Sequence, residues 1–497
     1  MSNYFFDMIP KEEKERLNYL PTIPQLLEKI KNDYSESPAI SNLATTITYS
    51  ELYQRVGCRR TFINKQGLTP GAKIAVFDRN SMEAIELFLA ITSAGYVAIM
   101  LPNALNEQQL IGSMKRFDVE MLFVRDEFKP KTEKIEGVKI FSTKETDTTF
   151  TPSADVQKTT VAAIFFTGGT TGAPKGAILN HGALMRGSFN GCFRPGSVIG
   201  GHRFIALLPF SHVFGLIFSM MSVLYTGNEL FTAEDMKTTI GQLPIIKPTC
   251  LVVVPGLAEI LYGLTKVHGV QFLGGNLKTI VSGAANVPPR LIGEFTKLGI
   301  NLVFGYGLTE TANLVSGNAE AVERPTSVGK IYSEQEHKVV DGELWVKGDC
   351  LFDGYYKDEE NTKAAFVDGW FRTGDLVKFD EDGYLYIVGR IKNLIILKNG
   401  ENVSPEALEE PFYKNPCIQD CLVTEKTIND ENVIAIEILP RMQAFQGKEW
   451  SEVVDYMQKV VDEVNATQPP FYRIAHVTVR KEDFKRTGSM KIARNQN

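Results

Sequence analysis

Apolar side chains in the first part of the chain follow helical spacing in some segments and form short continuous runs in others. Helical spacing begins after Thr22, whereas residues 73–77 form a short apolar run. The alternation continues: we expect helices after a Ser50 cap and over residues 82–94, 105–117, 213–225 and 257–264, and strands over residues 96–101, 121–124, 206–209, 250–254, 279–281 and 302–305. This alternation predicts an α/β fold with parallel sheets. The polar stretch 125–157 predicts an irregular surface connection.

From Gly342 onward the pattern changes to short strands separated by tight turns, among them the hairpin turn Asp382-Gly383. A further helix is expected from Ser404-Pro405, followed by strand, helix and strand patterns. We therefore predict a large N-terminal domain, residues 1–389, of layered α/β sheets plus a small β region. A small mobile C-terminal α/β domain, residues 390–497, would follow it.

One apolar strand, residues 164–166, leads into a loop rich in glycine and threonine, Thr167 to Gly176. Glycines let backbone N–H groups turn toward an anion, hydroxyls add donors, and Lys175 adds a mobile positive charge. The spacing differs from the Walker pattern, because no Ser or Thr follows Lys175. This stretch alone leaves two hypotheses open: a phosphate-binding loop and an ordinary turn between two strands.

Composition narrows the class of protein. A net charge of -6 over 497 residues leaves no excess of positive charge to attract a phosphate backbone, so we expect no nucleic-acid partner. Six scattered cysteines are typical of reduced thiols. The N-terminus lacks the basic flank and apolar core of a signal peptide. The most apolar window, residues 205–224, contains Pro209, Ser211 and His212 and predicts a buried segment. We expect a cytoplasmic protein with no transmembrane segment.

Seven motifs then follow one another along the chain. They are residues 167–176, 209–215, 305–310, 342–346 with 354–356, 370–375, 389–392 and 486–491. In this order they resemble the adenylate-forming superfamily, which comprises acyl- and aryl-CoA synthetases, nonribosomal peptide adenylation domains and firefly luciferase. Each motif alone is weak, but the ordered set is specific and covers nearly the whole chain. The chain looks most similar to AMP-forming acyl- or aryl-CoA ligases.

The resemblance implies how the chain would bind ATP and Mg²⁺. Glu310 would hold Mg²⁺, Asp375 and Arg390 would bind the ribose, and Tyr306 would stack on adenine. The adenine would also be enclosed by Gly283, Ala284 and Ala285, with Gly307 nearby. Phosphate contacts would come from Thr309 and from the loop residues Thr167, Gly168, Gly169, Thr170, Thr171, Gly172 and Lys175.

Catalysis is assigned to Lys491, Thr309, Glu310 and His212. Lys491 would bridge the incoming carboxylate and the α-phosphate. The resemblance places the acyl pocket at His212, Val213, Phe214, Gly215, Gly305 and Gly307. Val213 stands where peptide adenylation domains typically have an aspartate, which argues against an amino acid substrate and favours an uncharged fatty or aryl tail.

Lys392 falls at the position of the family's hinge. Rotation there would withdraw Lys491 and bring the turn containing Lys398 and Gly400 to the channel for coenzyme A or a phosphopantetheinyl carrier protein. Simpler interpretations also exist: Lys392 as a surface lysine, Asp375 as a turn residue, Glu310 as a helix cap, and His212 as an ordinary buried histidine.

The predicted function is activation of a small-molecule carboxylic acid to acyl-AMP, followed by thioester formation with CoA. Two alternatives remain open. One is an acyl- or aryl-AMP ligase that loads an acyl or peptidyl carrier protein. The other is a non-catalytic homologue that binds nucleotide or ligand, because Gly168 and Met490 replace the usual serine and glycine.

Overall fold

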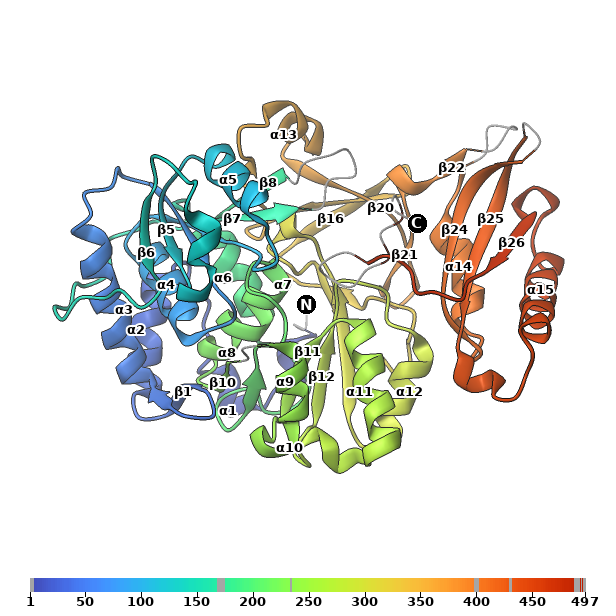
Figure 1. Ribbon diagram of the computed structural model, residues 1–497, viewed down its shortest axis with the longest axis horizontal. Helices are drawn as coiled ribbons and strands as arrows, with labels where there is room; N and C mark the ends of the chain where they lie inside the picture. Colours follow the sequence, from blue (N-terminus) through green and yellow to red (C-terminus); the bar gives the residue numbers. More distant parts are fainter. Residues whose placement is uncertain are drawn as a thin grey trace.

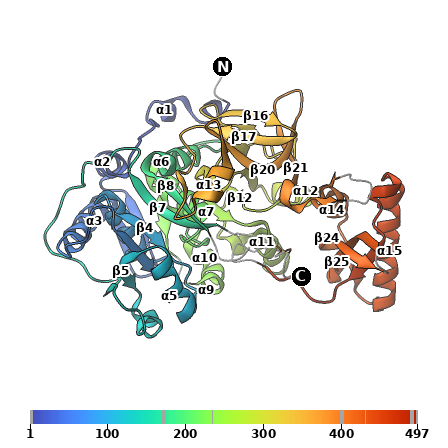
Figure 2. The ribbon, with the colours of Figure 1, turned by 90° about the horizontal axis from the view of Figure 1, so that it is seen from above.

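The computed structural model describes residues 4–167, 175–232, 235–396, 402–428 and 431–486, together with Ile492 and Arg494. A large N-terminal part and a smaller C-terminal part stand side by side, and the smaller part lies to one side in both views (Figures 1 and 2). Each has its own buried core: the main core runs from Phe5 to Leu385, and the C-terminal core from Ile395 to Ile474. The boundary predicted after residue 389 stays a prediction.

The largest sheet has seven strands in the order β18-β8-β7-β4-β3-β5-β6. They are β3 (Lys73–Phe77), β4 (Val97–Met100), β5 (Val119–Val124), β6 (Lys139–Ser142), β7 (Val161–Thr167), β8 (Lys175–Asn180) and β18 (Gly354–Tyr355). Strands β3 to β7 pair in parallel, whereas β8 and β18 add antiparallel edges. The accompanying helices are α2 (Ile23–Tyr34), α3 (Tyr49–Asn64), α4 (Met82–Ser93), α5 (Glu107–Arg116) and α6 (His181–Asn190).

Two expectations for this region are wrong. The cap of α3 is Thr48, whose side chain accepts from the Glu51 N–H in a capping box, and not Ser50. The stretch 125–157 is not irregular throughout, because it contains η2 (Asp126–Thr132) and the edge strand β6. That strand is half-buried at the sheet edge, so it lacks the apolar run of a central strand.

Two further sheets belong to the N-terminal part. One has the order β2-β1-β10-β9, with β1 (Pro38–Ser41), β2 (Thr46–Thr48), β9 (Arg203–Ile205) and β10 (Glu229–Phe231). The other has the order β11-β12-β13-β14-β15, with β11 (Cys250–Val253), β12 (Thr279–Ser282), β13 (Asn301–Tyr306), β14 (Ser316–Asn318) and β15 (Lys330–Ile331). Associated helices are α7 (Val213–Leu216), the π-helix η3 (Ile217–Met221), α8 (Ser222–Tyr225), α9 (Met236–Gly241), α10 (Leu243–Ile246), α11 (Pro255–His268), η4 (Val270–Leu273) and α12 (Pro289–Lys297).

The strand predicted at residues 206–209 instead lies directly before them, as β9. The Asn80 side chain donates to the carbonyls of Ala206 and Leu208, each at 2.7 Å, and accepts from the Phe210 N–H at 3.0 Å. These backbone groups are therefore engaged by a side chain instead of a sheet.

The small β region and the C-terminal part complete the chain. The β region contains β16 (Glu336–Val340), β17 (Glu343–Lys347), α13 (Glu359–Ala365), β19 (Phe366–Val367), β20 (Trp370–Phe379) and β21 (Leu385–Arg390). The C-terminal part contains β22 (Ile395–Ile396), β23 (Asn402–Val403), α14 (Pro405–Tyr413), β24 (Ile418–Ile428), β25 (Glu431–Pro440), α15 (Trp450–Ala466) and β26 (His476–Val479). Short helices are η1 (Phe6–Met8), α1 (Lys11–Lys14), η5 (Thr309–Thr311), η6 (Ile391–Asn393), η7 (Met442–Phe445) and η8 (Pro470–Tyr472). Within the described ranges, no helix has the length and apolar character needed to cross a bilayer.

Candidate active site

A cleft of about 2280 Å³ opens at the carboxyl ends of β12 and β13 and is also lined by β20, β21 and the C-terminal part. It brings together most of the predicted site residues that the structure describes. These are Thr167, Lys175, His212, Val213, Phe214, Gly283, Ala284, Ala285, Gly305, Tyr306, Gly307, Thr309, Glu310, Asp375, Arg390 and Lys392. Outside the described residues lie Gly168, Gly169, Thr170, Thr171, Gly172, Lys398, Gly400 and Lys491.

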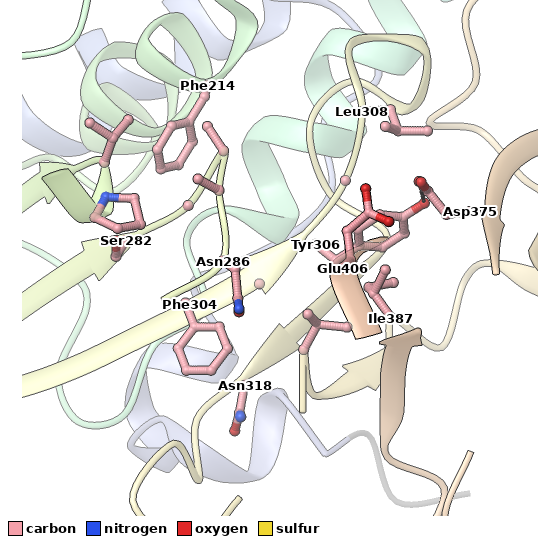
Figure 3. A pocket seen from close by; sticks show the side chains of 18 of the residues that line it. Phe214, Ser282, Asn286, Phe304, Tyr306, Leu308, Asn318, Asp375, Ile387 and Glu406 are labelled. Carbon is pink, nitrogen blue, oxygen red and sulfur yellow. Dashed lines mark hydrogen bonds between the residues drawn. The ribbon is translucent and has the colours of Figure 1, made fainter. Parts of the chain in front are cut away.

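Asp375 is the centre of a buried hydrogen-bond network. Neighbouring strands place it opposite Arg390, which donates through Nε to Oδ1 at 2.5 Å and through Nη2 to Oδ2 at 3.0 Å. The Tyr306 hydroxyl donates to Oδ2 at 2.6 Å, and the two side chains point toward each other in Figure 3. Burial opposes the charge of Arg390, yet its bond to Asp375 holds the pKa of Arg390 above its ordinary value.

The Asp375 carboxylate can therefore accept few further hydrogen bonds. An ionised carboxylate offers about four lone-pair sites, and these three donors occupy three of them. Two ribose hydroxyls could bind it only if at least one donor moved away. Tyr306 would be free to leave as a neutral phenol, because burial followed by the Asp375 charge raises its pKa well above the ordinary value.

A second cluster joins Glu310 to the start of β8. The Tyr355 hydroxyl donates to Glu310 Oε1 at 2.8 Å, and Lys175 Nζ lies 4.9 Å from the centre of the Tyr355 ring. Lys175 also donates to Asn361 Oδ1 at 2.5 Å. Tyr355 and Asn361 were not predicted as site residues. Tyr355 belongs to a quoted motif that could have indicated it, whereas nothing in the sequence pattern indicated Asn361.

Glu310 fits a Mg²⁺ ion that is shared with phosphate. The described residues contain no group of three or more His, Cys, Asp or Glu side chains able to hold a metal. Mg²⁺ in nucleotide sites is bound by one or two carboxylates, with phosphates and waters completing the octahedron. Glu310 has a second carboxylate oxygen beyond the one that Tyr355 occupies, so a single carboxylate in this position suffices.

The two glycines at the end of β13 line the cleft and allow close packing of the backbone. A Cβ at Gly305 would lie 2.4 Å from the Ser316 carbonyl, and one at Gly307 would lie 1.7 Å from the Asn313 carbonyl. Both glycines thus allow β13 to approach the following chain closely, so their missing side chains do not widen the pocket. Gly283 differs, because a Cβ there would meet the ring of Phe214 at 2.9 Å.

The segment after Phe210 supplies one wall. His212 precedes α7 and is half-buried, and Val213 and Phe214 line the cleft. Phe214 lies on the side opposite Asp375 (Figure 3). Gly215 is not among the described lining residues, because its missing side chain faces the carbonyls of Pro209 and Leu208 at 2.4 and 2.9 Å. Its predicted pocket position stays a prediction, and its missing side chain allows close packing at α7.

Lys392 lies in η6 between the two parts of the chain. Burial, followed by the charge of Arg390, lowers the pKa of Lys392. Although its charged end is partly desolvated, the side chain is exposed, so the hinge stays a prediction and the simpler interpretation of a surface lysine stays open.

The C-terminal part brings the residues on either side of Lys491 to the same cleft. Arg486, Ile492 and Arg494 line it, and Arg486 forms an antiparallel bridge with Ile492. Arg486 Nη2 donates to Asp420 Oδ2 at 2.9 Å, and Arg494 Nη2 donates to Glu409 Oε2 at 2.6 Å. Ion pairs thus attach Arg486 to β24 and Arg494 to α14.

One carboxylate also connects the two parts directly. Glu259 on α11 pairs with Arg290 on α12 of the same part and with Arg441 of the C-terminal part, whose Nη2 lies 3.4 Å from Glu259 Oε1. A charged contact between two residues that line the cleft therefore joins the two parts.

The profile of the family described as "AMP-binding enzyme" matches residues 27–356, which is most of the chain. The chain belongs to the AMP-binding enzyme family. A second profile, "AMP-binding enzyme C-terminal domain", matches residues 392–497. The predicted superfamily and the prediction of an enzyme are confirmed.

Among curated relatives of this family member is 4-coumarate--CoA ligase-like 6 of Arabidopsis thaliana, 29% identical over 86% of this chain and 81% of the relative. Another is 2-succinylbenzoate--CoA ligase of Bacillus cytotoxicus, 28% identical over 78% of this chain and 82% of the relative. ATP-bound MatB from Rhodopseudomonas palustris has a similar structure, with TM-score 0.82, 24% identity and coverage of 95% and 97% of the two chains. This likeness confirms the predicted α/β fold with a large and a small domain.

Proposed function

We propose that this family member is an ATP-dependent acid–CoA ligase that converts a fatty or aryl carboxylic acid to acyl-AMP and then to the CoA thioester. The observation that supports it most directly is the cleft itself. The Asp375 network, the Glu310–Tyr355–Lys175 cluster and the residues flanking Lys491 all line one space. The curated relatives described above are named CoA ligases.

In the first half-reaction the acid's carboxylate attacks the α-phosphorus of ATP, and the bond to pyrophosphate breaks. Two negative groups about 3.5 Å apart repel by roughly 5 kcal/mol at an effective dielectric constant near 20, so the site must supply positive charge. Lys175 and the loop before it would bind the β- and γ-phosphates, and Thr309 would donate to phosphate. Glu310 would hold Mg²⁺, which supplies charge neutralisation to the phosphates. Lys491 would bind both the carboxylate and the α-phosphate oxygens.

In the second half-reaction the thiol of CoA attacks the acyl carbon, and AMP leaves with the electron pair of the anhydride bond. Rotation about Lys392 would remove Lys491 and bring the segment with Lys398 and Gly400 to the thiol. Val213 and Phe214 would contact the acid's apolar part. A cytoplasmic location belongs to this proposal, supported by six free cysteines.

The test measures AMP release with ATP, Mg²⁺ and a panel of fatty and aromatic acids, with and without CoA. Acceleration by CoA with one class of acid supports the proposal. AMP release that requires a phosphopantetheinylated carrier protein instead of CoA would identify a carrier-loading ligase. Failure of every acid to promote exchange of labelled pyrophosphate into ATP would contradict adenylation and leave the non-catalytic alternative.

A further inference from the structure

The cleft continues from the predicted acyl site into a deeper apolar part. Val281 and Val303 are paired across β12 and β13, and both line the cleft. They precede Gly283 and Gly305 by two residues, so they share one face of the sheet and lie about 7 Å further along the strands. Phe218 of the π-helix also lines the cleft, with its ring 5.3 Å from that of Phe214.

Arg194 lines the same cleft toward the other end of these strands. It follows α6, and its guanidinium carbon lies 5.0 Å from the centre of the Phe204 ring on β9. The neighbouring Arg203 and Thr249 exchange backbone and side-chain hydrogen bonds of 2.9 and 3.0 Å. Because Thr249 directly precedes β11, Arg194 lies near the amino ends of the strands, away from Asp375 and Glu310.

Arg194 is buried, with 6% of its surface exposed, and it differs from the other arginines of the described cleft. Its Nη2 donates to the Val198 carbonyl at 3.3 Å, and no carboxylate among the described residues forms an ion pair with it. Every other described arginine lining the cleft has such a carboxylate: Arg290, Arg372, Arg390, Arg441, Arg486 and Arg494.

A buried charge is costly unless it is paired, and an arginine offers five donors, of which one is engaged here with the Val198 carbonyl. The planar guanidinium matches a carboxylate in two parallel hydrogen bonds. A carboxylate delivered by a ligand would pair the charge, whereas a plain hydrocarbon tail would leave it unpaired.

We propose that the acid substrate is a dicarboxylic acid, with an apolar body along Val281, Val303 and Phe218 and a second carboxylate bound by Arg194. This inference rests on the proposed function and makes its substrate class narrower. It also replaces the sequence-based expectation of an uncharged tail: the walls of the pocket are apolar, but its far end carries a positive charge.

The experiment compares kcat/KM for acid-dependent AMP formation with α,ω-dicarboxylic acids of increasing length and with monocarboxylic acids of matched length. The wild-type enzyme should prefer the best diacid by about 10- to 100-fold over its matched monoacid, as expected for hydrogen bonds to a charged group. Arg194→Met should remove this preference, and Arg194→Lys should restore part of it, because charge returns without the planar fork. The ratio is taken within one preparation, so a smaller folded fraction does not affect it.

Arg186→Met is the matched control. Arg186 is a buried arginine of the preceding helix that pairs with Asp349 at 3.8 Å and is not among the described lining residues of the cleft. Its substitution should leave the diacid-to-monoacid ratio unchanged. A wild-type preference for monoacids, or an unchanged ratio in Arg194→Met, would overturn the inference while the ligase activity stands. Absence of AMP with every acid would overturn the proposed function and this inference together.

Discussion

Replacing Asp375 by Asn tests whether the buried network at the proposed ribose site acts as one charged unit. Asp375 is 3% exposed and accepts three hydrogen bonds, two of them from Arg390. Asn keeps the shape but loses the charge, so Arg390 would lose its buried counter-charge. Such a loss costs roughly 3–5 kcal/mol in a fully buried pair. Because the Arg390 side chain is 32% exposed, we expect about 2–4 kcal/mol here.

The double variant Asp375→Asn/Arg390→Gln distinguishes the effect of an unpaired buried charge from other effects of the substitutions on the fold. It removes both charges, so it should be more stable than Asp375→Asn alone. Urea unfolding followed by tryptophan fluorescence would give the free energies of unfolding of the wild type, both single variants and the double variant. Both variants that lack the carboxylate should lose about 100-fold in kcat/KM for ATP, since one or two charge-assisted bonds to ribose are gone.

Three results would each refute a part of this reasoning. Stability of Asp375→Asn within about 0.5 kcal/mol of wild type would show that Asp375 and Arg390 are not a coupled pair. Equal stability of the single and double variants would show that no uncompensated charge arises. An unchanged kcat/KM for ATP in both would remove Asp375 from the predicted ribose site, leaving it a structural role in the pairing of β20 with β21.

Three further outcomes are expected. Lys491→Ala should cost about 3–4 kcal/mol in adenylation and spare thioester formation from supplied acyl-AMP; equal losses in the separately assayed half-reactions would contradict its assignment. Lys392→Pro should impair mainly the thiol step, and unchanged overall turnover would argue against the hinge. Burial lowers the pKa of His181 to about 4, so its unfolded form takes up a proton that the folded form excludes. Stability should therefore fall by about 3 kcal/mol as the pH drops from roughly 6.5 to 4. His181→Gln, which can still accept from the Ile23 N–H, should flatten that loss in urea midpoints measured across this range, and a profile parallel to wild type would disprove the link.

The sequence pattern predicted those candidate site residues that come directly after a strand. Tyr306 and Glu310 come at or just after the end of β13, and parallel strands bring such residues to one edge. Contacts between distant segments could not be predicted in this way. The bond from Lys175 to Asn361 spans 186 residues and depends on β18 pairing with β8. The spacing of apolar residues also gives no information about Arg194. Its proposed role depends on the absence of an ion pair with any described carboxylate, and only the three-dimensional structure shows that.

Among the described residues Glu259 has two arginine partners, Arg290 of its own part and Arg441 of the C-terminal part. If that part rotates about Lys392, Arg441 departs but Arg290 remains, so Glu259 keeps a counter-ion throughout the motion. Arg441 is partly exposed, at 24% of its side chain, and would exchange Glu259 for water. Breaking and remaking the contact across the cleft would thus cost little free energy, as the proposed rotation about Lys392 requires.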